Sequence, residues 1–403
     1  MKLTTGGVCA AQGFTAMGMH CGIRKNRTKP DLALIFSETR ATAAAVYTTN
    51  LVKGAPLVVT KQHIADGYAQ AIICNSGNAN TCNSDGIEVA EKTCEYLGQA
   101  LGISAQDVVV ASTGVIGQKM DITPIQNGIP TLVAELGNHS SLAATAIMTT
   151  DTVKKEIAVS FEIDGKECHL GGIAKGSGMI HPNMATMLVF ITTDVAISSK
   201  MLQKALSSDV ANTFNMVSVD GDTSTNDMVT VLANGMAGNQ EITCEGEAFD
   251  TFMQALNTVT VHLCRSIAGD GEGATKLLEC QVSNAPSEEI AKIVAKSVIC
   301  SSLTKAAMFG ADANWGRVLC AIGYSGAKVD VNKISVSFIS NKGSVLVCEN
   351  GAGVDFSEEI AKEILLEKEI TIAIDLCDGA QSATAWGCDL TYDYVKINGD
   401  YRT

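Results

Sequence analysis

The residues best suited to chemistry lie near the middle of the chain, where a glycine-rich polar segment, 175–183, leads into Thr186 and an apolar stretch, 187–191. β-Branched and aromatic residues in that stretch predict a buried strand, which places Thr186 at a loop-to-strand junction. A threonine hydroxyl is a weak nucleophile unless a base lies beside it, and its own α-amino group can be that base. This chemistry requires cleavage between Ala185 and Thr186.

A second segment of this kind, 112–117, follows a predicted strand at 108–111. Gly114 lets the backbone turn there and leaves N–H groups free to point away from the strand. Backbone N–H groups in such a turn can stabilise the oxyanion that forms during acyl transfer.

Two polar segments resemble ligand-binding loops only superficially. Residues 218–227 look like a calcium loop, but Thr225 stands where the sixth-position glycine belongs and Val231 where the twelfth-position glutamate belongs. Residues 269–276 look like a nucleotide-binding glycine loop, yet they follow a predicted helix, whereas a dinucleotide fingerprint follows a strand. We therefore expect the first segment to bind no calcium and the second to bind no dinucleotide.

Other polar side chains near the nucleophile have simpler explanations. His181 is a tempting general base, but Pro182 beside it indicates a loop, and the α-amino group of Thr186 already fills that role. Asp220, Asp222 and Asp227 are expected to organise a loop. We therefore expect no metal site.

The elements that must position these residues alternate between strands and helices. Apolar runs predict strands at 32–36, 71–74, 108–111, 157–161, 187–191, 334–339, 345–348, 371–376 and 391–397. Helical spacing predicts helices at 86–101, 130–136, 248–267, 287–308 and 357–366. The pattern indicates an α/β or α+β fold with strands in both directions. A chain of 403 residues is longer than a single hydrophobic core usually supports, so we expect two lobes with a boundary near residue 280.

The composition excludes several classes of protein. Lys and Arg number 29 against 43 Asp and Glu, which argues against nucleic acid as a partner. The 14 cysteines include no CxxC pair, so neither a zinc knuckle nor a disulfide framework is expected. We expect reduced thiols in a cytoplasmic protein instead. No window approaches 18 uninterrupted apolar residues, and residues 1–22 resemble no targeting sequence, so no membrane span is expected.

Several segments together resemble the ornithine acetyltransferase family, also called the bifunctional glutamate N-acetyltransferase family of arginine biosynthesis. The resemblance covers essentially the whole chain and rests on residues 111–117, 148–152, 174–187, 218–227, 269–276 and 398–403. It implies a two-lobed α+β fold in which helices and mixed sheets form a sandwich. It also implies self-cleavage into an α chain, 1–185, which carries the oxyanion loop, and a β chain, 186–403. Two α and two β chains would form a heterotetramer.

The same resemblance implies the reaction. Thr186 takes the acetyl group from N2-acetyl-L-ornithine and passes it to L-glutamate, while Thr113 and Gly114 form the oxyanion hole. The implied substrate contacts are Thr149, Lys175, Thr186, Glu272, Asn398 and Thr403. Within this set, we expect Lys175 to hold the substrate α-carboxylate, and Glu272 and the C-terminal carboxylate of Thr403 to lie near amines. No cofactor is implied, although acetyl-CoA is a candidate second donor.

Two alternatives remain open at this point. An N-terminal-nucleophile amidase or aminopeptidase would also cleave itself, but it would pass its acyl group to water. A different class altogether, an amino-acid-binding protein, would never free its threonine and would bind acetylornithine without turnover. The acceptor of the acyl group separates the first alternative from the acetyltransferase, and cleavage separates the second.

Overall fold

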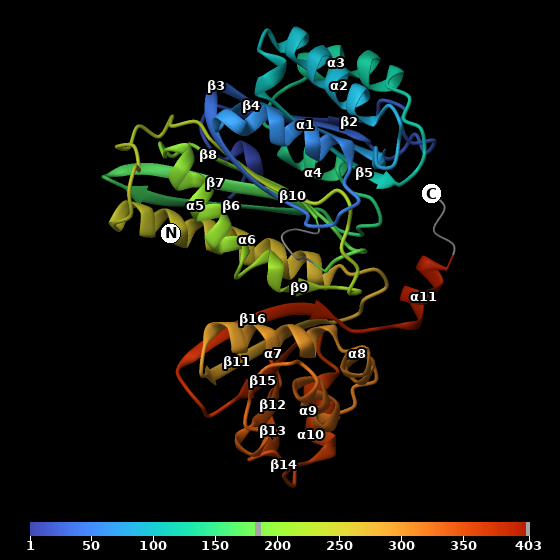
Figure 1. Ribbon diagram of the computed structural model, residues 1–403, viewed down its shortest axis with the longest axis vertical. Helices are drawn as coiled ribbons and strands as arrows, with labels where there is room; N and C mark the ends of the chain where they lie inside the picture. The colour runs from blue at the N-terminus through green and yellow to red at the C-terminus, as the bar shows by residue number, and fades with distance from the viewer. Residues whose placement is uncertain (182–186, 400–403) are drawn as a thin grey trace.

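The computed structural model describes residues 1–181 and 187–399, and the strands of these residues form two sheets (Figure 1). The larger sheet has nine described strands in the order β1-β6-β7-β8-β10-β3-β4-β5, with β2 paired to β3. Its members are β1 (Lys2–Thr4), β2 (Phe14–Met19), β3 (Leu32–Tyr47), β4 (Tyr68–Asn78), β5 (Val108–Val115), β6 (Lys155–Ile163), β7 (Lys166–Lys175), β8 (Leu188–Thr193) and β10 (Met228–Ala233).

The second sheet has seven strands within the same described residues, in the order β14-β13-β12-β15-β11-β16-β9. Its members are β9 (Val217–Ser218), β11 (Leu277–Ala285), β12 (Ser335–Ser340), β13 (Gly343–Glu349), β14 (Ala352–Gly353), β15 (Glu369–Asp375) and β16 (Gln381–Cys388). The short strand β9 precedes β10 in the chain but pairs with β16, so it joins the two sheets.

The helices cover the faces of both sheets. They are α1 (Ala55–His63), α2 (Gly86–Leu101), α3 (Thr123–Ala134), α4 (Ser140–Ala146), α5 (Ser199–Val210), α6 (Glu247–Gly269), α7 (Glu288–Cys300), α8 (Ser302–Phe309), α9 (Trp315–Gly323), α10 (Glu358–Leu365) and α11 (Tyr392–Asn398). The long helix α6 packs on β6 and β7 of the first sheet and on β11 and β16 of the second, and so lies between the two lobes (Figure 1). The predicted α+β class with two lobes and mixed sheets is confirmed.

Burial explains why the centre of the chain becomes a strand. Every residue of β8 is buried, because one face of the strand packs into the core that contains α5 and α6, and the other face into a second core beneath α4. A strand buried on both faces has a continuous apolar sequence rather than an alternating one. Leu188 pairs with Lys175 on one side and with Met228 on the other, so three strands meet at the point where β8 begins.

Three predicted elements differ in the structure. Residues 391–397 were expected to form a strand but belong mainly to the helix α11, because Thr391 caps the helix by accepting a hydrogen bond from the Tyr394 N–H. The predicted helix 287–308 is two helices, α7 and α8, which break at Ser301, where Ser301 caps the second. The predicted helix 130–136 begins earlier, at Thr123, with Pro124 in its first turn.

Within the described ranges, 1–181 and 187–399, no helix combines the length and the apolar character needed to cross a membrane. Among these same residues, no three His, Cys, Asp or Glu side chains are grouped in a way that would hold a metal ion.

Candidate active site

A cavity of about 330 Å³ lies where the ends of β5 and β7 meet the loop that precedes β10. All the predicted site residues that the structure describes line this cavity: Thr113, Gly114, Thr149, Lys175, Glu272 and Asn398. The remaining ones, Ala185, Thr186 and Thr403, lie outside the described residues. The structure therefore brings together side chains from five segments that are far apart in the sequence, while their individual roles stay predictions.

The predicted oxyanion loop is held tightly against the neighbouring strand. Gly114 ends β5 with a φ of 129°, and a Cβ at this position would lie only 2.4 Å from the Gly77 carbonyl carbon of β4. A side chain therefore cannot be added there without moving the backbone. Thr113 is 8% exposed and lines the cavity, and its hydroxyl forms no hydrogen bond within the described part of the chain, so it is available to a ligand there.

Asn226, in the loop that precedes β10, is hydrogen-bonded to β5 and to the segment that follows β4. Its amide donates to the backbone carbonyls of Ala79 at 2.6 Å and Ser112 at 2.9 Å. Its carbonyl oxygen accepts from the hydroxyls of Thr81 and Thr225, both at 2.6 Å. Because all four contacts are buried, they hold the segment that contains Thr113 and Gly114 in one position. The sequence patterns assigned Asn226 no role, although an asparagine two residues before the buried strand β10 was a usable signal.

The cavity has a cationic side at Lys175, the last residue of β7. Among the described residues, no side chain or carbonyl is hydrogen-bonded to the Lys175 ammonium, which lines the cavity and is 8% exposed. Burial alone would raise the pKa of Asp151, but Lys175, Lys155 and the Gly176 N–H outweigh it and lower that pKa to about 2. The Lys175 ammonium therefore lies near an ionised carboxylate and still has donors available to bind the carboxylate of a ligand.

Asp227 is a second acid near Lys175. Burial raises the pKa of Asp227 well above its ordinary value, and Lys175 opposes this only in part. One of its carboxyl oxygens, Oδ2, has no hydrogen-bond partner among the residues that the structure describes. The sequence suggested only that Asp227 organises a loop. One backbone contact is consistent with this prediction, because the Thr48 N–H donates to the Asp227 carbonyl at 3.0 Å.

The anionic side of the cavity is formed by Glu272 and its neighbours. Its carboxylate accepts a hydrogen bond from the Asn398 side chain at 2.8 Å, so α11 contributes a residue to the cavity. Gly178 leaves room for this carboxylate, since a Cβ there would lie 2.4 Å from Glu272 Cδ. A cavity with one free ammonium and one carboxylate suits a ligand that carries charges of both signs, as an amino acid does.

The described residues on either side of the predicted cleavage point lie close to this cavity. Ile180 and Met187 are both buried in the core that contains α6. A Cβ on Gly176 would lie 3.0 Å from the Ile180 side chain and 3.3 Å from the Met187 side chain. Because Gly176 directly follows Lys175, the chain enters and leaves the segment 182–186 beside a residue that lines the cavity.

His181 does not line the cavity. Its Nδ1 faces the Ser218 hydroxyl at 3.1 Å and the Cys300 thiol at 3.5 Å. Burial, with a smaller contribution from the Lys296 ammonium, lowers the pKa of His181 from 6.5 to about 4. The ring is therefore neutral near pH 7, and its contacts are those of a packed side chain.

This depressed pKa predicts a pH-dependent stability. Between about pH 6.5 and pH 4 the unfolded chain binds a proton that native His181 does not bind, so stability falls as the pH falls through this window. We expect the urea midpoint of the His181→Gln variant to change less between pH 7 and pH 5 than that of the unmodified protein. Equal changes in the two proteins would show that His181 does not resist protonation.

Comparisons with known proteins identify the relatives of this chain. The ArgJ family model matches residues 15–403. The chain is 50% identical, over 100% of both chains, to the arginine biosynthesis bifunctional protein ArgJ of Caldanaerobacter subterraneus subsp. tengcongensis. It is 47% identical to the protein of the same name from Thermotoga neapolitana, over 97% of this chain and 99% of that one.

A solved structure of the arginine biosynthesis bifunctional protein from Bacillus halodurans is similar as well. It is 45% identical, with a TM-score of 0.50, and the match covers 52% of this chain and 97% of that chain. The family predicted from the sequence is confirmed by these matches: the chain belongs to the ArgJ family.

Proposed function

We propose that the chain is an acetyltransferase that moves the acetyl group of N2-acetyl-L-ornithine to L-glutamate through an acetyl ester on Thr186. Relatives that match the whole chain are named arginine biosynthesis bifunctional proteins, and this chain is likewise an enzyme of arginine biosynthesis. One observation carries the finer proposal: the cavity gathers Thr113, Gly114, Lys175 and Glu272, which are the groups that acyl transfer between two amino acids needs.

The first step would create the nucleophile and its base together. The Thr186 hydroxyl attacks the Ala185 carbonyl, the amide nitrogen leaves as the α-amino group of Thr186, and water hydrolyses the resulting ester. An α-amino group has an ordinary pKa of about 7.7–8.0, so a useful neutral fraction exists near pH 7. Cleavage is also supported by the solved relative, since 97% of its chain corresponds to only 52% of this one, as expected for one of two fragments.

The second step would use that amino group twice. It accepts the proton of the Thr186 hydroxyl as this attacks the acetyl carbon, and it returns the proton to the departing α-amine of ornithine. The reverse sequence transfers the acetyl group from the ester to the α-amine of glutamate. Backbone donors at Thr113 and Gly114 would stabilise the oxyanion in both halves. Because both substrates carry an α-carboxylate, Lys175 can bind either of them.

The direct test combines mass with turnover. Denaturing mass spectrometry of the purified protein should give two fragments in place of one 42.1 kDa chain, and one fragment should begin Thr186-Met187-Leu188. Mixing that protein with acetylornithine and labelled glutamate should give labelled N-acetylglutamate. Release of acetate alone would favour the amidase alternative, and an uncleaved protein that binds acetylornithine without turnover would favour an amino-acid-binding protein.

The same assay can address two finer points of the proposal. Acetyl-CoA is proposed as a second acetyl donor, and product formed from acetyl-CoA and glutamate without acetylornithine would establish it. The two kinds of fragment are proposed to assemble as two α and two β chains in the cytoplasm. Native mass spectrometry should then find a particle with twice the mass of the 42.1 kDa chain.

Lys175 provides a test of substrate binding. We expect Lys175→Met to raise the KM for acetylornithine by about 10–100-fold, because a hydrogen bond to a charged group contributes about 1.5–3 kcal/mol. Lys154→Met is the matched control, since Lys154 is an exposed lysine that contacts Ser141 and Glu156 rather than the cavity. A Lys175→Met enzyme with an unchanged KM would exclude Lys175 as the carboxylate-binding residue.

A further inference from the structure

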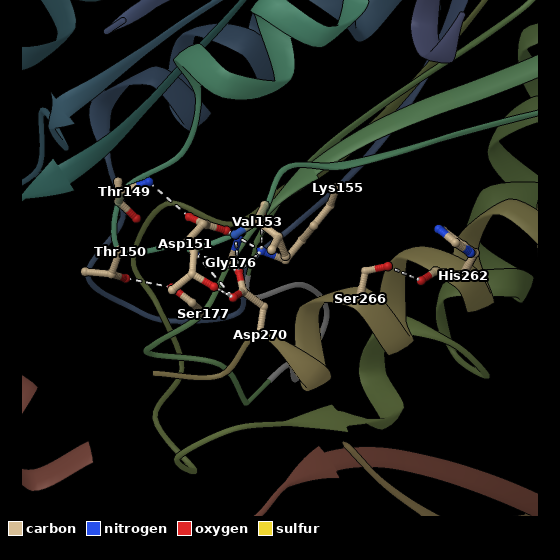
Figure 2. A network of polar contacts seen from close by, with 11 residues as sticks. Thr149, Thr150, Asp151, Val153, Lys155, Gly176, Ser177, His262, Ser266 and Asp270 are labelled. Carbon is tan, nitrogen blue, oxygen red and sulfur yellow. Dashed lines mark hydrogen bonds and ion pairs between the residues drawn. The ribbon is translucent and has the colours of Figure 1, made fainter. Parts of the chain in front are cut away.

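A buried group of charged side chains lies directly behind the cavity. Lys155, at the start of β6, places its ammonium 2.7 Å from Asp151 Oδ1 and 2.6 Å from Asp270 Oδ2 (Figure 2). The side chains of Lys155 and Asp151 are fully buried, and that of Asp270 is 6% exposed. We call these three residues the buried triad. None of them lines the cavity.

The first carboxylate of the triad holds two segments that line the cavity. Asp151 Oδ2 accepts a hydrogen bond from the Thr149 N–H at 3.0 Å. Asp151 Oδ1 accepts one from the Gly176 N–H at 2.7 Å, and Gly176 directly follows Lys175 (Figure 2). One side chain therefore sets the separation between the backbones of Thr149 and Lys175.

The second carboxylate ties the same loop to the end of α6. Asp270 accepts hydrogen bonds from the N–H of Thr152 at 3.1 Å and from the Thr152 hydroxyl. Two residues further on is Glu272, whose N–H donates to the Ser177 carbonyl at 2.8 Å. The Ser177 hydroxyl in turn contacts the Thr150 hydroxyl at 2.7 Å. The segments that carry Thr149, Lys175 and Glu272 are thus joined through the triad and its neighbours.

We propose that the buried triad of Asp151, Lys155 and Asp270 is the positioning device of the substrate site, which fixes Thr149, Lys175 and Glu272 relative to one another. A buried charge is costly unless it is paired and hydrogen-bonded, so only one arrangement of the three segments satisfies all the donors and acceptors. Buried ion pairs contribute little to stability compared with well-packed apolar residues, so stability alone does not explain the triad. The inference rests on the proposed function, because it needs those three residues to contact substrate.

The triad makes no contact with the predicted oxyanion loop in the hydrogen bonds of the described residues. Its loss should therefore weaken the binding of substrate without removing stabilisation of the oxyanion. Interactions that are equally strong in the ground state and the transition state change KM and leave kcat nearly constant. A split between KM and kcat is the signature that separates a positioning role from a general loss of stability.

Asp151→Asn is the principal variant, because it keeps the size of the side chain and removes its charge. We expect the KM values for acetylornithine and glutamate to rise by about 10–100-fold, with kcat within about threefold of the unmodified enzyme. Self-cleavage should persist, which the intact mass reports independently of turnover. Unchanged KM values for both substrates would overturn the proposal.

Asp209→Asn is the matched control. Asp209 is also a buried aspartate with side-chain partners, Asn257 at 2.9 Å and Thr213 at 3.1 Å, but it lies on α5 and does not line the cavity. We expect it to lower the melting temperature and to leave both KM values unchanged. An equal rise in KM for Asp209→Asn would show that any buried aspartate has this effect, and the proposal would fail.

Thr152→Val keeps the test decisive if Asp151→Asn does not fold. Thr152 is exposed, so the substitution removes its hydroxyl contact with Asp270 without opening the core. We expect a rise in KM of about three- to tenfold with normal folding. No rise would count against the triad. If the unmodified protein transfers no acetyl group, the proposed function fails first, and calorimetric titration with acetylornithine still compares the variants.

Discussion

We expect the Thr186→Ala variant to remain a single chain of 42.1 kDa and to transfer no acetyl group, with activity lower by about 10⁴-fold or more. Thr186 is the proposed nucleophile of both self-cleavage and acetyl transfer, and alanine removes the hydroxyl that both reactions need. Because cleavage also releases the α-amino group, the variant would lose the proposed base together with the nucleophile. Intact mass and the coupled transfer assay measure the two losses separately.

Thr186→Ser is the control for this prediction. Serine keeps a hydroxyl on the same backbone, so the variant should still cleave itself and retain measurable transfer. Two fragments from Thr186→Ala, or transfer by an uncleaved Thr186→Ala chain, would rule out the proposed mechanism.

The second large effect is expected at Gly114. Gly114→Ala would place a methyl group 2.4 Å from the Gly77 carbonyl carbon and 2.7 Å from the Asn78 nitrogen, so β5 must shift away from β4. That shift would displace the proposed oxyanion donors at Thr113 and Gly114. Loss of one such donor lowers kcat by about 10²–10³-fold, and we expect a fall of this size in acetyl transfer.

Gly117→Ala is the matched control in the same loop. Gly117 also has a positive φ, 75°, but a Cβ there would have no atom within 4 Å. The backbone strain is therefore comparable in kind, while the clash with β4 is absent. We expect Gly117→Ala to keep most of the activity. Equal losses in the two variants would mean that strain in the loop, rather than the position of the donors, limits the reaction.

Local patterns were sufficient for elements whose burial follows one face or one run of residues. The helix predicted at 86–101 agrees with α2, because its buried residues, which include Ala90, Cys94 and Leu97, recur at helical spacing. The strand predicted after Thr186 agrees with β8, which is buried on both faces. Residues 391–397 misled the prediction, since their β-branched and aromatic side chains favour a strand although Tyr392 is 85% exposed in α11.

The family and the identity of the proposed nucleophile could be predicted from residue order alone, because the segments around Thr113, Thr149, Lys175 and Glu272 are contiguous motifs. Their convergence on one cavity depended on the tertiary structure. Lys155 and Asp270 are separated by 115 residues, and Asn226 and Ala79 by 147. No local pattern encodes such contacts, since they arise from the order in which strands join the sheet and from the packing of α6 between the lobes. For the same reason, Asp151 and Asn226 gained a physical role only when their buried partners were placed around them.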